Sequence, residues 1–335
     1  MNLSYCWLSL LQSHKLEQID QATSPIRSTR RQHGGTNGGT KNNKNKYPIK
    51  NNTLRSKKPG HKLAFFMPAR QSLAMTDRYF DHLGARFAQR IYDSPKGAIR
   101  LAVLQRDLQQ WLPALLQAES PLHILDIGAG LGQISGWLAG LGHQLTVAEP
   151  SEAMLDAARE RINASNPALP VRFMQAPLQD LAAQGERYDL VICHAVLEWL
   201  ADPAQALQQL AALMQPAGAL SLAFYNRDAL IYKNLVKGQF KKLRKKPLSG
   251  QGTSGLTPQQ PIDPRDAMQW IAAASLSCLA TSGVRVFYDY MPEPFCSNSS
   301  LEDLIEYELR YSQHPAYQHL GRYLHWWLRP ATTLD

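Results

Sequence analysis

The sequence has few cysteines and no long apolar run, and both absences exclude classes of protein. Its 335 residues include four cysteines, Cys6, Cys193, Cys278 and Cys296, which lie far apart without a C-x-x-C pair. This pattern does not predict a disulfide framework or a cysteine-ligated zinc site, and it fits a reducing compartment such as the cytoplasm. No stretch of eighteen apolar residues occurs, so we expect no membrane-spanning helix. The first eleven residues lack the basic start and the cleavage site of a signal peptide.

The charge of the chain is distributed unevenly. Residues 1–75 contain 13 of the 36 Lys and Arg residues and two of the 27 acidic residues. This segment therefore carries a net charge of +11, whereas the remaining residues carry −2. The basic character belongs to the first segment, and the rest of the chain is nearly neutral.

Residues 1–74 are predicted to be a disordered basic extension. The stretch 32–46 has no large apolar residue, so it cannot bury enough surface to offset the entropy lost on ordering. Two interpretations remain open. The segment is a basic arm that adds affinity for RNA, or it is an upstream extension from a wrongly assigned start codon, with Met67 or Met75 as the true start. The domain pattern begins abruptly at Thr76, which favours the second interpretation.

Strands and helices alternate from Thr76 onward, and this predicts one domain over residues 75–335. Strands are expected at 122–127, 144–149, 171–175, 188–193, 219–225, 282–288 and 321–328. Helices are expected near 76–91, 97–117, 131–141, 151–163, 178–183, 203–214, 226–237, from 264 and at 301–311, with a loop from 238 to 263. Several strands, such as the one containing Leu190-Val191-Ile192, are continuously apolar, as in sheets that are buried on both faces. The sequence therefore predicts an α/β, Rossmann-like fold with a mostly parallel seven-stranded sheet and helices on both faces.

The strongest motif is a glycine loop directly after the first predicted strand. It runs from Asp126 through Gly128, Ala129 and Gly130 to Gly132, in the form D-x-G-x-G-x-G. Glycines allow a tight turn and a close approach of the backbone to a ligand. A dinucleotide fingerprint would place its third glycine one residue later, where this chain has Gln133. The loop therefore favours S-adenosylmethionine over a nicotinamide dinucleotide as the cofactor.

Polar residues end the neighbouring strands, and parallel strands bring such ends to one crevice. Glu149 is suited to the two ribose hydroxyls, Leu178 and Gln179 to the adenine edge, and His194 ends the fourth strand. Structural alternatives remain open: Glu149 beside a helix start, Gln179 as a solvated helix start, and His194 as a helix cap. Trp199 is interpreted as a core residue rather than as a platform for adenine.

From about Thr76 to Arg329 the chain resembles the bacterial tRNA 5-carboxymethoxyuridine methyltransferases. The matching stretches are Asp77-Arg78-x-Phe80-Asp81, Ile91-Tyr92-x3-Lys96-Gly97-x2-Arg100, His194-Ala195-Val196-Leu197-Glu198-Trp199-x-Ala201-Asp202-Pro203, Phe224-Tyr225-Asn226, Gly283-Val284-Arg285-Val286-Phe287-x-Asp289-Tyr290 and Leu320-Gly321-Arg322-Tyr323-x-His325. The resemblance excludes the first 74 residues.

This resemblance implies a class I methyltransferase that uses S-adenosylmethionine to esterify the carboxylate of 5-carboxymethoxyuridine at the wobble position, 34, of a tRNA. It implies that Arg100 binds the methionine carboxylate, that Gly128 and Ala129 hold the cofactor, and that Glu149 binds its ribose. Leu178 and Gln179 would bind the adenine, and His194 would flank the cofactor. The chain departs from the family at Ala129, where glycine is expected, and at Glu149, where aspartate is usual. Arg100 is also suited to a carboxylate by its planar donors, although an exposed helix arginine is the alternative.

Two groups of residues are candidates for the tRNA. Arg285 and Arg322, with Tyr225, Phe287 and Tyr323 nearby in the predicted fold, suit an extruded base and its carboxylate, although Arg285 also suits a structural ion pair. A second group is basic without any acid and suits the tRNA backbone, although a solvated loop is the alternative. This group comprises Lys233, Lys237, Lys241, Lys242, Arg244, Lys245 and Lys246.

The expected reaction needs no catalytic acid, base or metal, because a carboxylate is already ionised at neutral pH. Its rate would come from alignment of the carboxylate with the methyl–sulfur bond and from exclusion of water. Two other functions compete with this one. A small-molecule methyltransferase of the same fold would leave the basic cluster incidental, and an RNA-binding module would bind the cofactor without turnover. The sequence does not predict the oligomeric state.

Overall fold

The computed structural model of the chain describes residues 76–78, 94–116, 120–244, 258 and 260–331. The predicted extension over residues 1–74, most of the helix expected near 76–91, and Lys245 and Lys246 lie outside the described residues. Among the helices of the described part, none combines the length and the apolar character needed to cross a lipid bilayer.

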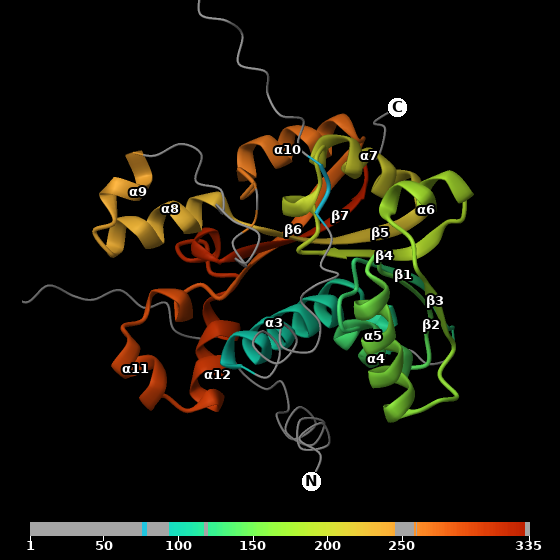
Figure 1. Ribbon diagram of the computed structural model, residues 1–335, viewed down its shortest axis with the longest axis horizontal. Coiled ribbons are helices and arrows are strands. Elements are labelled where there is room, and N and C mark those ends of the chain that lie inside the picture. Colours follow the sequence, from blue (N-terminus) through green and yellow to red (C-terminus); the bar gives the residue numbers. More distant parts are fainter. Residues whose placement is uncertain (1–75, 79–93, 117–119, 245–257, 259, 332–335) are drawn as a thin grey trace, which may run out of the picture. The chain divides into compact units, whose positions relative to one another are not determined.

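Helices and strands alternate along the described chain, as Figure 1 shows. The strands are β1 (His123–Ile127), β2 (Gln144–Ala148), β3 (Val171–Met174), β4 (Tyr188–His194), β5 (Met214–Tyr225), β6 (Leu276–Val284) and β7 (Tyr323–Pro330). The α-helices are α3 (Pro95–Trp111), α4 (Gln133–Gly140), α5 (Glu152–Ser165), α6 (Leu178–Gln184), α7 (Pro203–Ala212), α8 (Arg227–Val236), α9 (Phe240–Arg244), α10 (Pro264–Ala273), α11 (Glu293–Asn298) and α12 (Leu301–Tyr311). Short 3-10 helices are η1 (Pro113–Leu116), η2 (Leu197–Trp199), η3 (Tyr288–Tyr290) and η4 (Gln318–Leu320).

The seven strands form one sheet in the order β3-β2-β1-β4-β5-β7-β6. The first five strands in this order are parallel, and β7 runs antiparallel to both of its neighbours. The chain moves outward from β1 to β3 and then returns to place β4 on the other side of β1. Ligands of open α/β sheets bind where the strand order reverses in this way. The predicted mostly parallel seven-stranded fold is confirmed, and its expected ligand crevice lies beyond the ends of β1 and β4.

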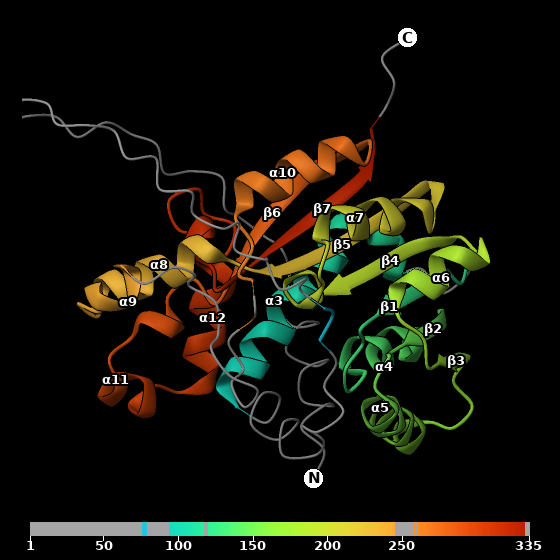
Figure 2. The same ribbon diagram turned by 45° about the horizontal axis from the view of Figure 1, so that its top comes forward.

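Helices cover both faces of the sheet. Helices α6, α7 and α10 lie on one face, and α3, α4 and α5 lie on the other (Figures 1 and 2). In β1, Leu125 packs into the first layer and Ile124 into the second, since successive side chains of a strand point to opposite faces. The two buried layers of apolar side chains hold the strand ends, and with them the residues that follow, in fixed positions.

The prediction of a strand over residues 282–288 is wrong for residues 285–288. Strand β6 ends at Val284, and Arg285 has a left-handed backbone with a φ of 61°. The buried carboxylate of Glu308 accepts the backbone N–H groups of Val286, Phe287 and Tyr288 and so stabilises a turn here. Because of this turn, Arg285 leaves the sheet and is not part of β6.

Smaller differences concern element ends. The helix expected near 131–141 begins at Gln133, because Gly132 has a left-handed backbone with a φ of 66°. Residues 240–244, expected to be a loop, form the short helix α9. The last strand is displaced by two residues from 321–328 and spans Tyr323–Pro330.

Candidate active site

The glycine loop between β1 and α4 turns back on itself at three glycines. Gly128, Gly130 and Gly132 have φ values of 62°, 58° and 66°, a region that other residues rarely adopt. A Cβ atom on Gly128 would lie 2.5 Å from Cγ2 of Val196. The N–H group of Gly128 donates to the carbonyl of Ala148 at the end of β2, at 2.8 Å. The sequence therefore needs glycine at position 128 for both its backbone conformation and its packing.

Two carboxylates at the ends of β1 and β2 form the acidic wall of the site: Asp126 lies in β1, one residue before its end at Ile127, and Glu149 directly follows β2. Asp126 is 4% exposed and accepts a hydrogen bond from the Ser135 hydroxyl at 2.5 Å. Burial raises the pKa of Asp126 to about 7; the nearby charge of Glu149 adds to this effect, while Ser135 and Arg100 oppose it. Glu149 accepts the N–H group of Gly130 at 3.1 Å and that of Ser151 at 3.2 Å. Glu149 thus stabilises the start of α5, as its structural alternative proposed, and also faces the glycine loop.

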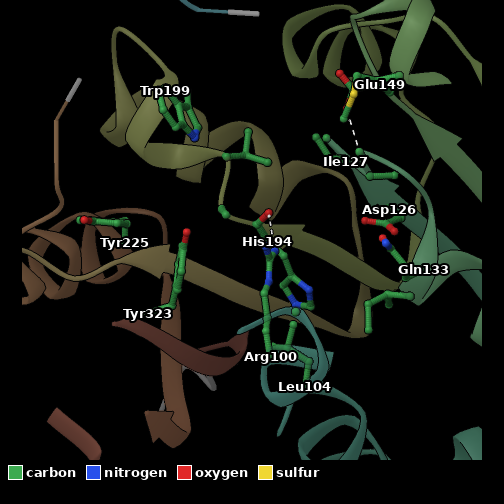
Figure 3. A pocket seen from close by; sticks show the side chains of 18 of the residues that line it. Arg100, Leu104, Asp126, Ile127, Gln133, Glu149, His194, Trp199, Tyr225 and Tyr323 are labelled. Carbon is green, nitrogen blue, oxygen red and sulfur yellow. Dashed lines mark hydrogen bonds between the residues drawn. The ribbon is translucent and has the colours of Figure 1, made fainter. Parts of the chain in front are cut away.

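Arg100 and His194 meet at the middle of the site, where Figure 3 shows them side by side. Arg100 extends from α3, and its Nη2 atom donates to the carbonyl of His194 at 3.4 Å. Its guanidinium also lies 5.4 Å from the centre of the Tyr323 ring. His194 is 8% exposed, and burial lowers its pKa well below the ordinary value, with His325 and Arg100 adding to the effect. The ring is therefore neutral at neutral pH.

Leu178 and Gln179 lie at the start of α6, beyond the end of β3. Leu178 is buried, whereas Gln179 is exposed and donates from Nε2 to Asp77 at 3.0 Å. Trp199 is half-buried and lines a cavity together with Leu178 and Gln179, so its interpretation as a core residue is wrong. It lies in η2, a single 3-10 turn, where helical spacing from Val196 does not place a side chain in the core.

Cations and aromatic rings form the opposite side, the basic wall, which comprises Arg285, Arg322 and Lys233 around Asp289. Arg285 pairs with Asp289 at 2.9 Å, and Lys233 pairs with the same carboxylate at 3.3 Å. Burial opposes ionisation of Asp289, but Arg285, Arg322 and Lys233 together lower its pKa below the ordinary value. The guanidinium of Arg322 lies 4.5 Å from the centre of the Tyr225 ring, and its Nη1 atom is buried without a hydrogen-bond partner among the described residues. Arg322 therefore has one donor atom that no described residue uses.

One cavity of about 600 Å³ joins the acidic and basic walls. It is lined by every predicted cofactor residue, namely Arg100, Asp126, Gly128, Ala129, Gly130, Glu149, Leu178, Gln179 and His194, and by Tyr225, Arg285 and Arg322. Its volume lies within the range of small-molecule and cofactor sites. The structure thus brings together residues that are more than 200 positions apart in the chain, such as Arg100 and Arg322.

The candidate lysines do not all lie where the sequence suggested. Lys241 and Lys242 are exposed on α9 and do not line the cavity. Lys233, expected in the same basic surface, instead points to Asp289 and lines the cavity. Asp289 itself was not a predicted site residue. Its spacing of four from Arg285 was a signal, but the turn that brings the two together was not predicted.

Comparison with known proteins identifies relatives of the chain. The Methyltransferase domain family matches residues 125–222, which span β1 to β5. The tRNA 5-carboxymethoxyuridine methyltransferase of Escherichia coli K12 is 36% identical over 263 residues, 78% of this chain and 99% of that protein. The ubiquinone biosynthesis O-methyltransferase of Coxiella burnetii is 28% identical over 162 residues, 48% of this chain and 66% of that protein.

Solved structures show the same fold. The magnesium protoporphyrin IX methyltransferase of Synechocystis PCC 6803, with bound SAH, has a TM-score of 0.50 at 19% identity and covers 75% of this chain and 95% of that one. The family match includes the glycine loop and Glu149, and the chain matches the Escherichia coli relative over nearly its full length. The chain therefore belongs to the tRNA 5-carboxymethoxyuridine methyltransferase family, within the S-adenosylmethionine-dependent methyltransferases.

Proposed function

We propose that this chain transfers the methyl group of S-adenosylmethionine to the carboxylate of 5-carboxymethoxyuridine at position 34 of a tRNA, giving the methyl ester. The observation that carries the proposal is the opposite charge of the two cavity walls. A cationic sulfonium donor suits the carboxylates Asp126 and Glu149, and an anionic acceptor suits Arg285 and Arg322.

The residues of the acidic wall fit the methyl donor. Gly128 leaves room that a side chain would fill, since its Cβ would overlap Val196, and the loop can approach a ligand closely. Glu149 lies 17 residues after Gly132 and suits the ribose hydroxyls, as in related α/β sites. Arg100 would bind the methionine carboxylate. Ala129 and Gly130 would hold the cofactor from the loop, Leu178 and Gln179 would bind the adenine, and His194 would flank it.

The residues of the basic wall fit the acceptor nucleotide. Arg322 stacks on Tyr225 and keeps one buried donor atom without a protein partner among the described residues. Arg285 stacks 5.5 Å from the centre of Tyr323 and is held by Asp289. Extruded RNA bases stack on aromatic rings and guanidinium planes, and a guanidinium binds a carboxylate through two donors. Asp289 neutralises part of the positive charge, so the carboxylate is attracted without being held too tightly to react.

The chemistry needs positioning more than proton transfer. S-adenosylmethionine, when bound, supplies a methyl group that is already electrophilic. The acceptor carboxylate is ionised at neutral pH, so no residue of the chain acts as a general base. Arg322 and Arg285 would orient the carboxylate toward the methyl donor, and α3 would exclude water from between them.

The surface of α8 and α9 fits the tRNA backbone around the anticodon stem-loop. Lys237, Lys241, Lys242 and Arg244 are exposed there. Large apolar side chains, including Val236 (56% exposed) and Phe240 (54% exposed), lie among them. Basic side chains attract phosphates, and exposed aromatic rings can stack on unpaired bases. A substrate of this kind is present in the cytoplasm, which is the proposed location.

The test is methyl transfer to tRNA purified from cells that lack this activity. The full chain is incubated with this tRNA and methyl-labelled S-adenosylmethionine, and the digested nucleosides are separated and identified by mass spectrometry. The proposal expects the label in the methyl ester of 5-carboxymethoxyuridine. Label in a different nucleoside, or methylation of small molecules with none in tRNA, would overturn it. Binding of the donor without any transfer would support an RNA-binding module instead.

A further inference from the structure

A buried row of polar side chains runs beneath the cavity, across four strands of the sheet. The strand registers pair His194 with Ala223, Ala223 with His325, and His325 with Ser282, so these residues lie side by side across β4, β5, β7 and β6. Ser221 lies two residues before Ala223 and therefore on the same face of β5. Residues this far apart in the chain meet only because the sheet is assembled.

Hydrogen bonds connect this row into a chain. Nε2 of His194 lies 2.8 Å from the hydroxyl of Ser221, which lies 2.7 Å from Nε2 of His325. Nδ1 of His325 lies 2.8 Å from Oδ2 of Asp107 on α3. Ser221, His325 and Asp107 are fully buried, so no solvent competes for these bonds. Trp111 covers the His325 ring, with 4.8 Å between the ring centres.

The direction of each hydrogen bond follows from Asp107. Oδ1 of Asp107 accepts from Arg106 at 2.8 Å and from the Ser282 hydroxyl at 2.9 Å, so this carboxyl group already has a cationic partner. Because Arg106 already pairs with this carboxyl group, a second buried cation at His325 would be costly, and we therefore assign His325 as a neutral imidazole. Its Nδ1 then donates to Asp107, and its Nε2 accepts.

The remaining steps fix the proton on His194. Since Nε2 of His325 accepts, the Ser221 hydroxyl must donate to it. The Ser221 oxygen then accepts from Nε2–H of His194, which leaves Nδ1 of His194 without a proton. Nδ1 makes no hydrogen bond with any described residue, and His194 lines the cavity. The histidine thus offers the cavity a lone pair rather than an N–H group.

We propose that Asp107, His325 and Ser221 are positioning residues that hold His194 in the Nε2–H tautomer, so that its Nδ1 accepts a hydrogen bond from the ammonium group of the methyl donor. This inference rests on the proposed function for the identity of the donor, but the tautomer itself does not depend on it. A protonated Nδ1 would instead place an N–H group against a cationic ligand.

The tautomer is measurable directly in the full chain. Long-range proton–nitrogen correlation spectra of protein labelled with nitrogen-15 at histidine distinguish the two tautomers, and a His194→Asn variant assigns the His194 signals. We expect a protonated Nε2 and an unprotonated Nδ1 in the protein without ligand. A protonated Nδ1 on His194 would overturn the inference. This measurement stands without any further variant.

A matched pair of variants tests the link to the ligand. Ser221→Ala removes the bridge, whereas Ser282→Ala removes a hydroxyl that is equally buried and also bound to Asp107 but lies outside the path to His194. We expect calorimetry to show S-adenosylhomocysteine binding about tenfold weaker in Ser221→Ala, the effect of one hydrogen bond to a charged group, and unchanged in Ser282→Ala. Equal losses in both variants would show only a structural effect and would overturn the inference. Failure of the unaltered chain to bind this compound would instead overturn the proposed function. The proton–nitrogen spectra would still show which tautomer His194 adopts.

Discussion

The two walls of the cavity differ in charge and in how their residues are held. The acidic wall carries Asp126 and Glu149 beside a backbone turn made of glycines, whereas the basic wall carries Arg285 and Arg322 stacked on aromatic rings. The first wall suits a cationic nucleoside and the second an anionic base, with Arg100 between them. Under the proposed function, one cavity binds two ligands of opposite charge and directs their reacting ends toward each other. Changes confined to one wall should therefore affect one ligand.

The largest expected effect is the cost of ionising the acidic wall when no ligand is bound. The pKa of Asp126 rises from 3.8 to about 7 in the folded protein. Between these values the folded state holds more protons than the unfolded state, so the free energy of unfolding falls as pH rises from about 4 to about 7. Asp126→Asn should remove this loss and stabilise the ligand-free protein by about 4 kcal/mol at pH 8, with no difference near pH 4.

Thermal unfolding at several pH values checks this prediction. Asp180→Asn, a change at an exposed position on α6, serves as the control and should leave the pH profile unchanged. Parallel profiles for the unaltered chain and Asp126→Asn would show that Asp126 is not the group that titrates.

The next effect concerns the methyl donor alone. Glu149→Ala removes the carboxylate proposed for the ribose and should weaken S-adenosylhomocysteine binding about 100-fold in calorimetry, as expected for two hydrogen bonds to a charged group. Binding of tRNA should persist. Glu152→Ala, an exposed change in the first turn of α5, is the control. If both variants bind equally well, Glu149 serves only to stabilise the loop and the start of α5.

A smaller effect is expected for the acceptor. Arg322→Ala should lower kcat/KM for modified tRNA about 30-fold, roughly 2 kcal/mol, while the affinity for S-adenosylhomocysteine stays the same. Arg322→Lys should recover part of the activity, since it keeps the charge but not the planar donors. Arg329→Ala, at the far end of β7, is the control. Loss of donor binding in Arg322→Ala would contradict the division between the two walls.

The smallest effect is expected outside the cavity. Replacing Lys241 and Lys242 with Glu should weaken tRNA binding about tenfold at low salt and reduce the slope of log affinity against log salt by about 2. Donor binding should be unaffected. Arg159→Glu, on α5, tests for a general effect of charge. An unchanged salt dependence would exclude α9 from the tRNA surface.

The acidic wall could be predicted from the sequence more completely than the basic wall. Gly128, Glu149 and His194 follow strand ends, and the alternation of strands and helices already brings such ends together. In contrast, the position of Arg285 depends on a turn that the side chain of Glu308 stabilises. Because Glu308 lies 23 positions after Arg285, local sequence patterns do not reveal this turn. Lys233 was assigned to the outer surface because its partner, Asp289, follows the same turn.

The chain of hydrogen bonds beneath His194 also could not be predicted from the sequence. The two bonds that join Ser221 to His325 and His325 to Asp107 span 104 and 218 positions. Asp107 and Ser221 were not predicted as site residues, and His325 appeared only in one of the stretches that carry the family resemblance. Strand register, which hydrophobic patterns define only loosely, decides which polar side chains meet.

The most direct test of the two-wall account is a calorimetric titration of the full chain with S-adenosylhomocysteine, followed by two anticodon stem-loops. One stem-loop carries 5-carboxymethoxyuridine at the wobble position, and the other carries uridine. The account predicts that the compound binds first without RNA and that the modified stem-loop then binds about tenfold more tightly, an advantage lost in Arg322→Ala. Equal affinity for the two stem-loops, or uptake of a nicotinamide dinucleotide in place of S-adenosylhomocysteine, would contradict it.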